Sequence, residues 1–330
     1  MIKNSLKNMR VGVLGGGVSS EREVSLMSAN NILASLKGSG IDSVFIDINT
    51  EDENAIKQMI FSEGIDIAFI ALHGYFGEDG RIQAILERLE VLYTGSRPKP
   101  SLLAMDKISS KEIFLRESIP TPEFFLASSL EANIEFSKPV VVKPNYSGSS
   151  LGVTIVRDSL QLLPAIDIAY KAMNISKKGL HGLPRTEAVI VEEFISGREL
   201  TVGILGSKPL SVVEIIPESG CYDYFAKYND PNTKFIAPAN IDSDKYHMIQ
   251  GLALRTHLAL GCRHFSRVDF RLSDDGIAYV LEANSIPGFT SHSLLPFSAK
   301  ASGINFDELI LSILQIANDE SKKNQEIKAQ

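Results

Sequence analysis

The residues best suited to chemistry lie in one stretch, RVDFRLSDDGIAYVLEAN, which runs from Arg267 to Asn284. Its polar turn, SDDG, predicts a hairpin of two strands. Because side chains alternate between the faces of a strand, Arg267 and Asp269 are expected on one face. Glu282 and Asn284 are expected on one face of the partner strand. Two carboxylates and an amide oxygen gathered in this way suit Mg²⁺ that bridges phosphate groups.

The register of this hairpin leaves a second interpretation open. If the loop has four residues, Leu272 pairs with Ile277, and Asp269 lies diagonally from Glu282. Arg267 then lies nearly opposite Glu282, where the two side chains can form a cross-strand salt bridge. The spacing alone supports a metal site and a salt bridge equally.

A loop rich in glycine and serine, NYSGSS, follows Lys143 at the end of an apolar strand. The backbone N–H groups and hydroxyls of residues 147–150 are suited to bind a phosphate. The same segment matches the G-x-S-x-G nucleophile elbow, which requires a strand before the serine and a helix after it. Because a strand pattern, VTIV, follows, we favour a phosphate-binding hairpin loop over a serine hydrolase. An ordinary hairpin turn is the alternative.

Two acids, Glu192 and Glu193, end the apolar strand in VEEFISGRE, and Glu199 follows on the next segment. Carboxylates at these positions can accept hydrogen bonds from an adenine amino group and from ribose hydroxyls. Acids exposed to solvent on the protein surface are the alternative interpretation.

The glycine-rich stretch VGVLGGGVSSEREVSL near the N-terminus has the outline of a dinucleotide-binding loop. That fingerprint needs a third glycine where Ser20 stands, and an acid about 20 residues later, where Asp47 is available. Glu21 and Glu23 place negative charge at the start of the next helix, which repels a pyrophosphate and attracts an ammonium group. The same helix start could bind the amino group of a small substrate through Glu21. A favourable interaction with the helix dipole is the alternative.

The elements that must position these residues alternate between strand and helix in the first hundred residues. Strands are predicted at residues 11–14, 43–48 and 65–72, and helices at residues 20–36 and 81–90. Ser20 and Glu23 have the spacing of a capping box, and Gly38 is a stop signal. This alternation predicts an open, mostly parallel sheet that functions at the carboxyl ends of its strands.

The sequence changes character near residue 97, at GSRPKPS, which is a candidate domain boundary. A helix is predicted at residues 102–117, and a polar loop at 174–187 is unusually long. From residue 188 onward strands dominate, interrupted by a long helix at 244–260 and followed by a last helix at 306–317.

The composition limits the classes of function. The 330 residues carry a formal net charge of −7, which argues against non-specific binding to nucleic acid or to an acidic membrane. No apolar run approaches the roughly 20 residues of a membrane span, and the polar N-terminus is unlike a signal peptide. Cys221 and Cys262 lack metal or redox spacing, so we expect idle thiols in a reducing cytoplasm.

Eight blocks of this sequence, in order between residues 11 and 309, resemble the D-alanine–D-alanine ligase family of the ATP-grasp superfamily. The blocks are GGVSSEREVSLMSA, ALHGYFGEDGRIQ, YTGS with AMDK, VVVKPNYSGSSLGV, VEEFISGRELTVGILG, YDYFAKY, RVDF and LEANSIPGFTSHSLLP. The resemblance implies an α/β fold, α+β in its C-terminal part, in which an open parallel-sheet domain precedes an ATP-grasp fold. It also implies three domains, at residues 1–97, 98–191 and 192–330, with ATP held between the second and the third.

The resemblance further implies roles for individual residues. Those expected to bind ATP are Lys107, Lys143, Ser149, Ser150, Glu192, Glu193, Ile195, Glu199 and Lys227. Those expected to bind the amino-acid substrates are Glu21, His73, Lys227, Ser293 and Leu294. Those expected to act in catalysis are Glu21, Ser149, Tyr228, Arg267, Gly288 and Ser293. The expected ligands of two Mg²⁺ ions, with Mn²⁺ as an alternative, are Asp269, Glu282 and Asn284.

The implied reaction joins two D-alanine molecules through a D-alanyl phosphate, releases ADP and phosphate, and supplies peptidoglycan precursor synthesis. Tyr228 favours the dipeptide product, because relatives that make an ester with D-lactate commonly carry histidine at this position. Ligation of D-alanine to D-lactate or D-serine is the alternative. A non-catalytic ATP-binding protein is disfavoured, since the metal ligands and Arg267 are all present. The resemblance also implies a cytoplasmic homodimer.

Overall fold

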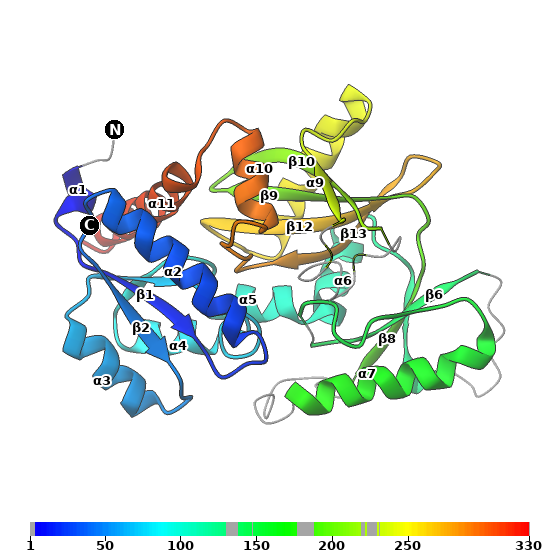
Figure 1. The fold of residues 1–330 in the computed structure, drawn as a ribbon, viewed down its shortest axis with the longest axis horizontal. Coiled ribbons are helices and arrows are strands. Elements are labelled where there is room, and N and C mark those ends of the chain that lie inside the picture. The colour runs from blue at the N-terminus through cyan, green and yellow to red at the C-terminus, as the bar shows by residue number, and fades with distance from the viewer. Residues whose placement is uncertain are drawn as a thin grey trace.

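Three β-sheets follow one another in the part of the chain that the structure describes, and helices connect and cover them (Figure 1). The structure is a computed structural model, and it describes residues 4–129, 138–146, 148–176, 188–218, 222, 230 and 232–329. The mixture of one parallel and two antiparallel sheets confirms the predicted fold class.

The first sheet is parallel and has the strand order β2-β1-β3-β4. Its strands are β1 (Val11–Gly16), β2 (Ser43–Ile48), β3 (Ile67–Ile70) and β4 (Leu92–Tyr93). Its helices are α1 (Asn4–Lys7), α2 (Arg22–Gly38), α3 (Glu53–Glu63) and α4 (Arg81–Arg88). β1 lies inside the sheet and is buried along its whole length, as expected for a parallel strand covered on both faces. The predicted open parallel sheet is confirmed.

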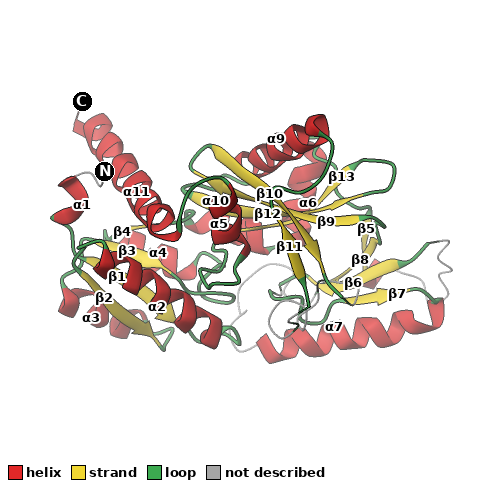
Figure 2. Ribbon diagram, turned by 45° about the horizontal axis from the view of Figure 1, so that its top comes forward, coloured by secondary structure: helices red, strands yellow, loops and turns green. Residues whose placement is uncertain are grey.

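The second sheet is antiparallel and has the order β5-β8-β6-β7. Its strands are β5 (Phe124–Leu126), β6 (Val140–Pro144), β7 (Thr154–Val156) and β8 (Val189–Glu193). The helical segments of this part are α5 (Pro98–Met105), α6 (Lys107–Arg116), α7 (Leu162–Ser176) and the 3₁₀ turns η1 (Ala127–Ser129) and η2 (Ser159–Gln161). α7 lies along this sheet (Figure 2), and its apolar residues pack on the strands.

The third sheet is antiparallel and has the order β11-β10-β9-β12-β13. Its strands are β9 (Arg198–Leu205), β10 (Lys208–Ile216), β11 (Lys234–Ile236), β12 (Phe265–Leu272) and β13 (Ala278–Asn284). The helices are α9 (Ser243–Ala259), α10 (Leu294–Ala301) and α11 (Phe306–Ala329). α9 and α10 pack on the sheet, whereas α11 reaches back to α2 and β4.

Three aromatic side chains hold the first sheet against the third. Phe69 on β3, Phe265 on β12 and Phe289 in the loop after β13 are all fully buried. The ring of Phe289 meets each of the other two rings edge-on, at 5.6 Å between centroids. This shared core fixes the carboxyl end of the first sheet next to the chain that leaves β13.

Three helix predictions are wrong in their limits. The last helix, predicted at residues 306–317, continues as α11 to Ala329. α2 begins at Arg22 with Glu21 at the N-cap, so the predicted capping box at Ser20 is wrong, and the helix continues through Gly38. The chain turns at Gly40 instead, where φ is +73°.

The helix predicted at residues 102–117 is divided in two by Asp106. Asp106 has extended backbone and caps α6 by accepting a hydrogen bond from Ser109 N at 3.0 Å. Its carboxylate also accepts hydrogen bonds from Asn145 and Tyr146, at 3.0 and 2.9 Å. Lys107 therefore stands at the first position of a helix that is anchored to the loop after β6.

Some predicted features are left untested. The division into domains at residues 97 and 191 stays a prediction, although β8 runs to Glu193 and so crosses the second limit. Cys221, Lys227, Tyr228 and residues 177–187 of the long loop lie outside the described residues.

Candidate active site

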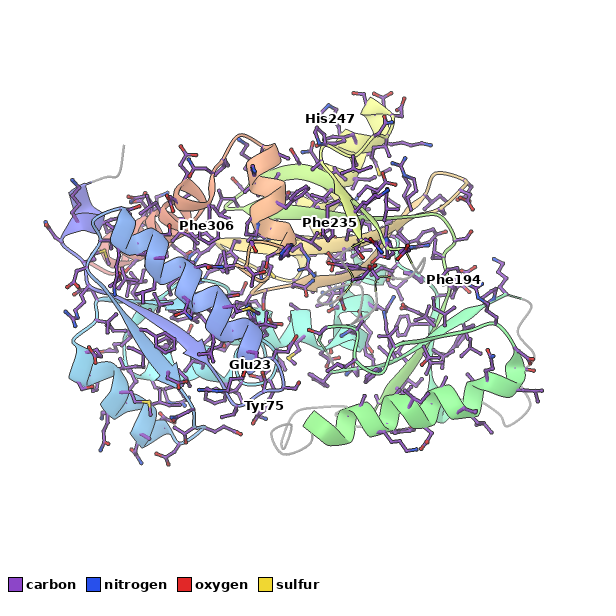
Figure 3. All side chains as sticks on the ribbon, in the orientation of Figure 1. Glu23, Tyr75, Phe194, Phe235, His247 and Phe306 are labelled. Atoms are coloured by element: carbon purple, nitrogen blue, oxygen red, sulfur yellow. The ribbon has the colours of Figure 1, made fainter. Side chains whose placement is uncertain are left out.

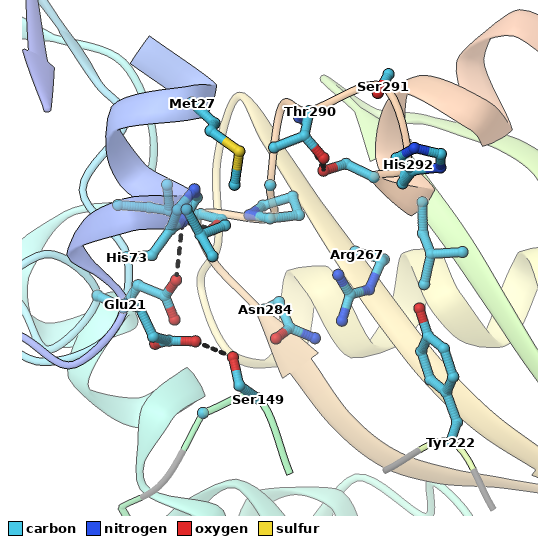
Figure 4. Close-up of a pocket in the computed structure, with 18 residues that line it drawn as sticks. Glu21, Met27, His73, Ser149, Tyr222, Arg267, Asn284, Thr290, Ser291 and His292 are labelled. Atoms are coloured by element: carbon cyan, nitrogen blue, oxygen red, sulfur yellow. Dashed lines mark hydrogen bonds and ion pairs between the residues drawn. The ribbon is translucent and has the colours of Figure 1, made fainter. Parts of the chain in front are cut away.

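A cavity of about 290 Å³ opens between the start of α2, the β6–β7 loop and the loop after β13 (Figure 4). The predicted site residues along its wall are Glu21, His73, Ser149, Arg267, Asn284, Gly288, Ser293 and Leu294. Its volume is close to the lower end of the range for small-molecule sites. Residues far apart in the sequence are thus brought together around a space that suits an amino acid.

Glu21 links the first sheet to the β6–β7 loop. Its carboxylate accepts a hydrogen bond from the hydroxyl of Ser149, which lies 128 positions later in the chain. Two glycines make room for the carboxylate: a Cβ at Gly148 would lie 2.8 Å from Glu21 Oε2, and one at Gly74 would lie 2.4 Å from it. A negative charge is therefore held at the edge of the cavity, where it suits an ammonium group.

His73 lines the same cavity and is held in one orientation by hydrogen bonds. Its Nε2 is 2.9 Å from Ser28 Oγ, and its Nδ1 is 3.1 Å from the carbonyl oxygen of Ile286. Glu78 Oε1 lies 3.5 Å from Nδ1. Ser28 also accepts a hydrogen bond from the backbone N–H of Phe289, so His73 and the loop after β13 share one partner.

The β12–β13 hairpin has the predicted faces but not the predicted register. Asp269 lies directly opposite Glu282, and Leu272 pairs with Ala278 rather than Ile277. The turn is one residue longer than predicted, and a register shift next to Asp269 adds one more residue to the offset. The expected diagonal placement of the two carboxylates is therefore wrong, because directly opposed residues on one face stand closer together.

Asp269 is the centre of the polar contacts on this hairpin. Arg267 donates to it twice, from Nε to Oδ1 at 2.9 Å and from Nη2 to Oδ2 at 2.8 Å. Asn284 Nδ2 donates a hydrogen bond to Asp269 Oδ2 at 3.1 Å, and Thr201 Oγ1 donates one to Asp269 Oδ1 at 2.6 Å. Arg267 thus pairs along its own strand, a contact that differs from the predicted salt bridge with Glu282. Burial acts to lower the pKa of Arg267, but Asp269 outweighs it and raises the pKa, so a permanent cation faces the cavity.

A second cavity, of about 130 Å³, lies farther along the same face of the hairpin, toward its turn and between the second and third sheets. The predicted site residues along its wall are Lys107, Lys143, Ser150, Glu192, Glu193, Ile195, Glu199, Asp269 and Glu282. Lys107 Nζ lies 3.5 Å from Glu282 Oε2. Tyr222 borders both cavities, so the two spaces are neighbours.

Glu192 is a buried carboxylate between two lysines. Lys143 Nζ lies 2.6 Å from its Oε1, and Lys111 Nζ lies 2.9 Å from its Oε2. Burial acts to raise the pKa of Glu192, but the two lysines outweigh it and hold the pKa below its ordinary value. Glu192 is thus an ionised hydrogen-bond acceptor inside the smaller cavity.

The segment after β8 forms the outer wall of the smaller cavity. Arg271 donates to the carbonyl oxygen of Ile195 at 3.0 Å and lies 3.4 Å from Glu199 Oε2, so both residues are held by one guanidinium. The same guanidinium lies 5.6 Å from the ring of Phe194, which Figure 3 labels. Glu193 turns outward to Lys138, at 2.7 Å.

Comparisons with known proteins agree with this geometry. A family model described as D-ala D-ala ligase C-terminus matches residues 123–315, and one described as D-ala D-ala ligase N-terminus matches residues 49–96. The D-alanine–D-alanine ligase of Citrifermentans bemidjiense is 42% identical over 319 residues, which are 96% of this chain and 99% of that protein. The ligase of Geotalea uraniireducens is 40% identical over 321 residues, which are 96% of this chain and 98% of that protein.

The chain belongs to the D-alanine–D-alanine ligase family.

Solved structures support the same assignment. A crystal structure of the Bacillus anthracis D-alanine–D-alanine ligase complexed with ATP matches this ligase with a TM-score of 0.77 at 32% identity, over 96% of this chain and 99% of the other. A second structure of the Bacillus anthracis enzyme matches with a TM-score of 0.79 at 34% identity. The predicted family, fold and ligase class are confirmed. None of the helices within the described ranges of this ligase is long and apolar enough to cross a membrane.

The loop after β13 presents three further predicted residues of the ligase. Ser293 stands at the N-cap of α10, and its hydroxyl accepts a hydrogen bond from Thr290 N at 2.9 Å. Leu294 is the first residue of α10, and its side chain is buried. A Cβ at Gly288 would lie 2.6 Å from Ser293 Oγ, so a side chain there would displace the Ser293 hydroxyl.

The β6–β7 loop of the ligase has unusual backbone conformations. Ser149 and Ser150 both have positive φ, +53° and +57°, a backbone conformation that residues other than glycine seldom adopt. Ser150 Oγ donates to the carbonyl oxygen of Tyr222 at 3.2 Å, and so ties the loop to the boundary between the cavities. Backbone strain of about 1–3 kcal/mol per residue is typical of sites where a ligand is bound.

Four residues of the ligase site were missed by reasoning from the sequence. Glu78 and Tyr222 lie inside two of the recognised blocks, HGYFGEDG and YDYFAKY, so their blocks were the available signal. Thr201 and Lys111 reach Asp269 and Glu192 only through tertiary packing. No spacing rule connects residues that are 68 or 81 positions apart in this way.

Proposed function

We propose that this ligase joins two D-alanine molecules through a D-alanyl phosphate, with ATP as the phosphoryl donor. The observation that supports this best is that the two cavities meet at one hairpin. Arg267 and Asn284 line the larger cavity, Asp269 and Glu282 line the smaller one, and Tyr222 borders both. An acyl-phosphate reaction needs this arrangement, because a phosphoryl group must pass from a nucleotide to a carboxylate held beside it.

The smaller cavity is the proposed ATP site. Lys107 and Lys143 bring positive charge for the phosphates. Glu192 accepts a hydrogen bond from the adenine 6-amino group, and Glu199 accepts hydrogen bonds from the ribose hydroxyls. Ile195 contributes its backbone beside the adenine. At about 130 Å³ the cavity is smaller than typical ligand sites, so we expect the β6–β7 loop to move outward when ATP enters.

The remaining proposed ATP contacts rest on the loop and on the resemblance. Ser149 and Ser150 line the two cavities from the strained loop, where hydroxyls and N–H groups suit phosphate oxygens. Glu193, the last residue of β8, borders the same cavity. Lys227 is proposed from the resemblance alone, since it lies outside the described residues.

Asp269, Glu282 and Asn284 are the residues proposed to hold Mg²⁺. Two carboxylates that face each other across a hairpin, with the side-chain amide of Asn284 beside them, form a donor set that fits a hard divalent cation. Within the described ranges no three His, Cys, Asp or Glu side chains converge, and phosphate oxygens commonly complete a Mg²⁺ site of this kind. When bound, Mg²⁺ would neutralise the charge that develops on the transferred phosphoryl group.

The larger cavity is the proposed site of the first D-alanine. Glu21 binds its ammonium group, and His73, fixed by Ser28, lies beside the same end of the cavity. The carboxylate then points toward the hairpin. One of its oxygens attacks the γ-phosphorus of ATP, the bond from phosphorus to the β,γ-bridging oxygen breaks, and ADP leaves.

The second D-alanine is proposed to bind through its carboxylate at Ser293 and the N–H of Leu294, at the start of α10. Its amine, once deprotonated, attacks the acyl carbon. Arg267 and the N–H of Gly288 stabilise the oxyanion that forms, and phosphate leaves as the C–O bond breaks. Tyr228 and Lys227 are proposed to act beside this substrate, and a closed loop excludes water that would hydrolyse the acyl phosphate.

The proposal is tested by phosphate release from ATP and Mg²⁺ with D-alanine, with L-alanine as the control. The result expected is D-alanine-dependent release of ADP and phosphate, and formation of the dipeptide. Addition of D-lactate or D-serine to D-alanine decides between the dipeptide ligase and a ligase with another acceptor. No ADP and no dipeptide with D-alanine would overturn the proposal.

Three further properties are proposed from the resemblance. We propose the domain division at residues 97 and 191, a homodimer, and a cytoplasmic location. Light scattering of the purified chain measures the oligomeric state, and limited proteolysis locates the domain limits.

A further inference from the structure

Lys111 is a buried cation at the back of the proposed adenine site. It stands on α6, one turn after Lys107, and its side chain is fully buried. Its ammonium lies 2.9 Å from Glu192 Oε2, and donates to Thr121 Oγ1 at 2.7 Å. It also lies 5.4 Å from the centre of the Phe124 ring. Lysines are almost never fully buried unless they are paired, because burial of a charge is costly, and the partner of Lys111 is Glu192.

The two lysines that contact Glu192 differ in their surroundings. Lys143 lines the nucleotide cavity. Lys111 lies behind Glu192 and is anchored by Thr121, whose hydroxyl in turn donates to the carbonyl oxygen of Val280 on β13 at 2.9 Å. Lys143 can therefore turn toward a ligand in the cavity, whereas Lys111 stays with the carboxylate.

Departure of Lys143 has an electrostatic consequence. The side chain of Glu192 is 4% exposed, so a carboxylate left there without a cation would be unpaired and buried. Removal of one partner from a buried ion pair is strongly unfavourable. Lys111 avoids this cost, because its positive charge remains beside Glu192 when Lys143 contacts a phosphate.

We propose that Lys111 is a positioning residue, the counter-ion that stays beside Glu192 and keeps this carboxylate ready for the adenine 6-amino group while Lys143 moves to the phosphates of ATP. This inference rests on the proposed function of the smaller cavity. It assigns to Lys111 an effect on the affinity for adenine nucleotides rather than on the chemical step.

The test compares ATP with inosine triphosphate, which carries a carbonyl oxygen at position 6 in place of the amino group. Dissociation constants are measured by calorimetry with the full chain and Mg²⁺, and without D-alanine. K111M is expected to weaken ATP binding by about tenfold or more, and to bring the two dissociation constants close together. The matched control is K138M, which removes an exposed lysine from Glu193 on the same strand and should leave both constants unchanged. A folded K111M with the wild-type preference for ATP would overturn the inference.

A second variant keeps the test decisive if K111M does not fold. K111M/E192Q removes both charges, and E192Q removes the carboxylate alone. If Lys111 acts through Glu192, the double variant binds ATP within about twofold of E192Q, because the two changes affect one contact. A further tenfold loss in the double variant would show that Lys111 acts by another route.

The result of the nucleotide-binding test can be distinguished from the result of the ligase assay. Nucleotide binding needs no D-alanine, so a chain that binds ATP through Glu192 and Lys111 but forms no dipeptide would contradict the proposed function and leave this inference standing. Equal affinity of the wild-type chain for the two nucleotides would overturn the inference, whatever the ligase assay shows.

Discussion

The hydroxyl of Ser149 donates a hydrogen bond to the carboxylate of Glu21 across 128 positions of the chain. Glu21 belongs to the N-cap of α2, beside the first sheet, and Ser149 belongs to the loop between two strands of the second sheet. One bond thus closes the phosphate loop over the carboxylate that is proposed to bind the first substrate. Loop position and substrate binding are coupled at this contact.

We expect Ser149→Ala to open this loop. Without the hydrogen bond from Ser149 to Glu21 the loop is closed for less of the time, and the acyl phosphate is exposed to water. The Michaelis constant for D-alanine should rise by roughly tenfold, which corresponds to the loss of one charged hydrogen bond of about 1.5 kcal/mol. Steady-state phosphate release, with dipeptide measured in parallel, should show more phosphate per dipeptide. Ser159→Ala, at an exposed serine after β7, is the control, and equal ratios in the two variants would contradict the coupling.

The carboxylate of Glu282 is expected to be essential for metal binding. Glu282→Ala removes a ligand that faces Asp269, so phosphate release should fall below detection while the fold is kept. Binding of Mn²⁺ in the presence of ADP, followed by electron paramagnetic resonance, gives a readout that is independent of turnover. Asp275→Asn in the exposed turn of the same hairpin should bind Mn²⁺ like the wild type. Wild-type Mn²⁺ binding in the Glu282 variant would rule out the metal assignment.

Arg267→Lys tests the oxyanion role of the guanidinium. Lysine keeps the charge but loses the two-point contact with Asp269 that aims Arg267 into the cavity. We expect kcat to fall by roughly 10²–10³, with a much smaller change in the Michaelis constant for ATP. Arg255→Lys, at an exposed arginine on α9, is the matched control. A fall in ATP affinity at constant kcat would assign Arg267 to nucleotide binding instead.

Glu320 on α11 is expected to make stability depend on pH. Its carboxylate contacts His264 Nε2 at 2.8 Å and Arg263 Nη1 at 2.9 Å, and these contacts, the hydrogen bond from His264 first, lower its pKa from 4.5 to about 2. A carboxyl whose pKa is lowered by folding stabilises the protein above its unfolded pKa. That stability is lost as the pH falls from 4.5 toward 2.

The Glu320→Gln variant measures this effect. Since the carboxylate is partly exposed, we expect a loss of roughly 1–2 kcal/mol at pH 7, and a difference from the wild type that shrinks below pH 4.5. Thermal unfolding between pH 7 and pH 3 follows the difference. Glu117→Gln, which removes an exposed surface pair, should change little at any pH. A stability difference between Glu320→Gln and the wild type that grows as the pH falls would contradict this prediction.

Much of the fold is predictable from local patterns. The strands of the first sheet are apolar runs separated by amphipathic segments, so their parallel direction follows from the alternation, whereas the order β2-β1-β3-β4 comes from the structure. The β6–β7 hairpin follows from two strand patterns on either side of a glycine- and serine-rich loop. The start of α2 was misplaced because Ser20 and Glu23 match a capping box, whereas in the structure Ser19 Oγ accepts from Glu21 N and the helix begins at Arg22.

The site is less predictable than the fold. Alternation placed Asp269 and Glu282 on one face, but the register shift that sets them directly opposite each other is a property of the paired strands. Lys111 was not identified because a lysine on a helix is usually exposed, and only tertiary packing around α6 buries it. Local sequence therefore gives the residue types, and tertiary structure decides their contacts.

The transfer of a phosphoryl group to the carboxylate of D-alanine is tested most directly with ¹⁸O. D-alanine labelled with ¹⁸O in both carboxylate oxygens is incubated with the purified chain, ATP and Mg²⁺, and the phosphate and dipeptide are analysed by mass spectrometry. If the carboxylate attacks the γ-phosphorus, each released phosphate carries one ¹⁸O, and the peptide carbonyl keeps the other. Unlabelled phosphate alongside dipeptide would contradict the acyl-phosphate route.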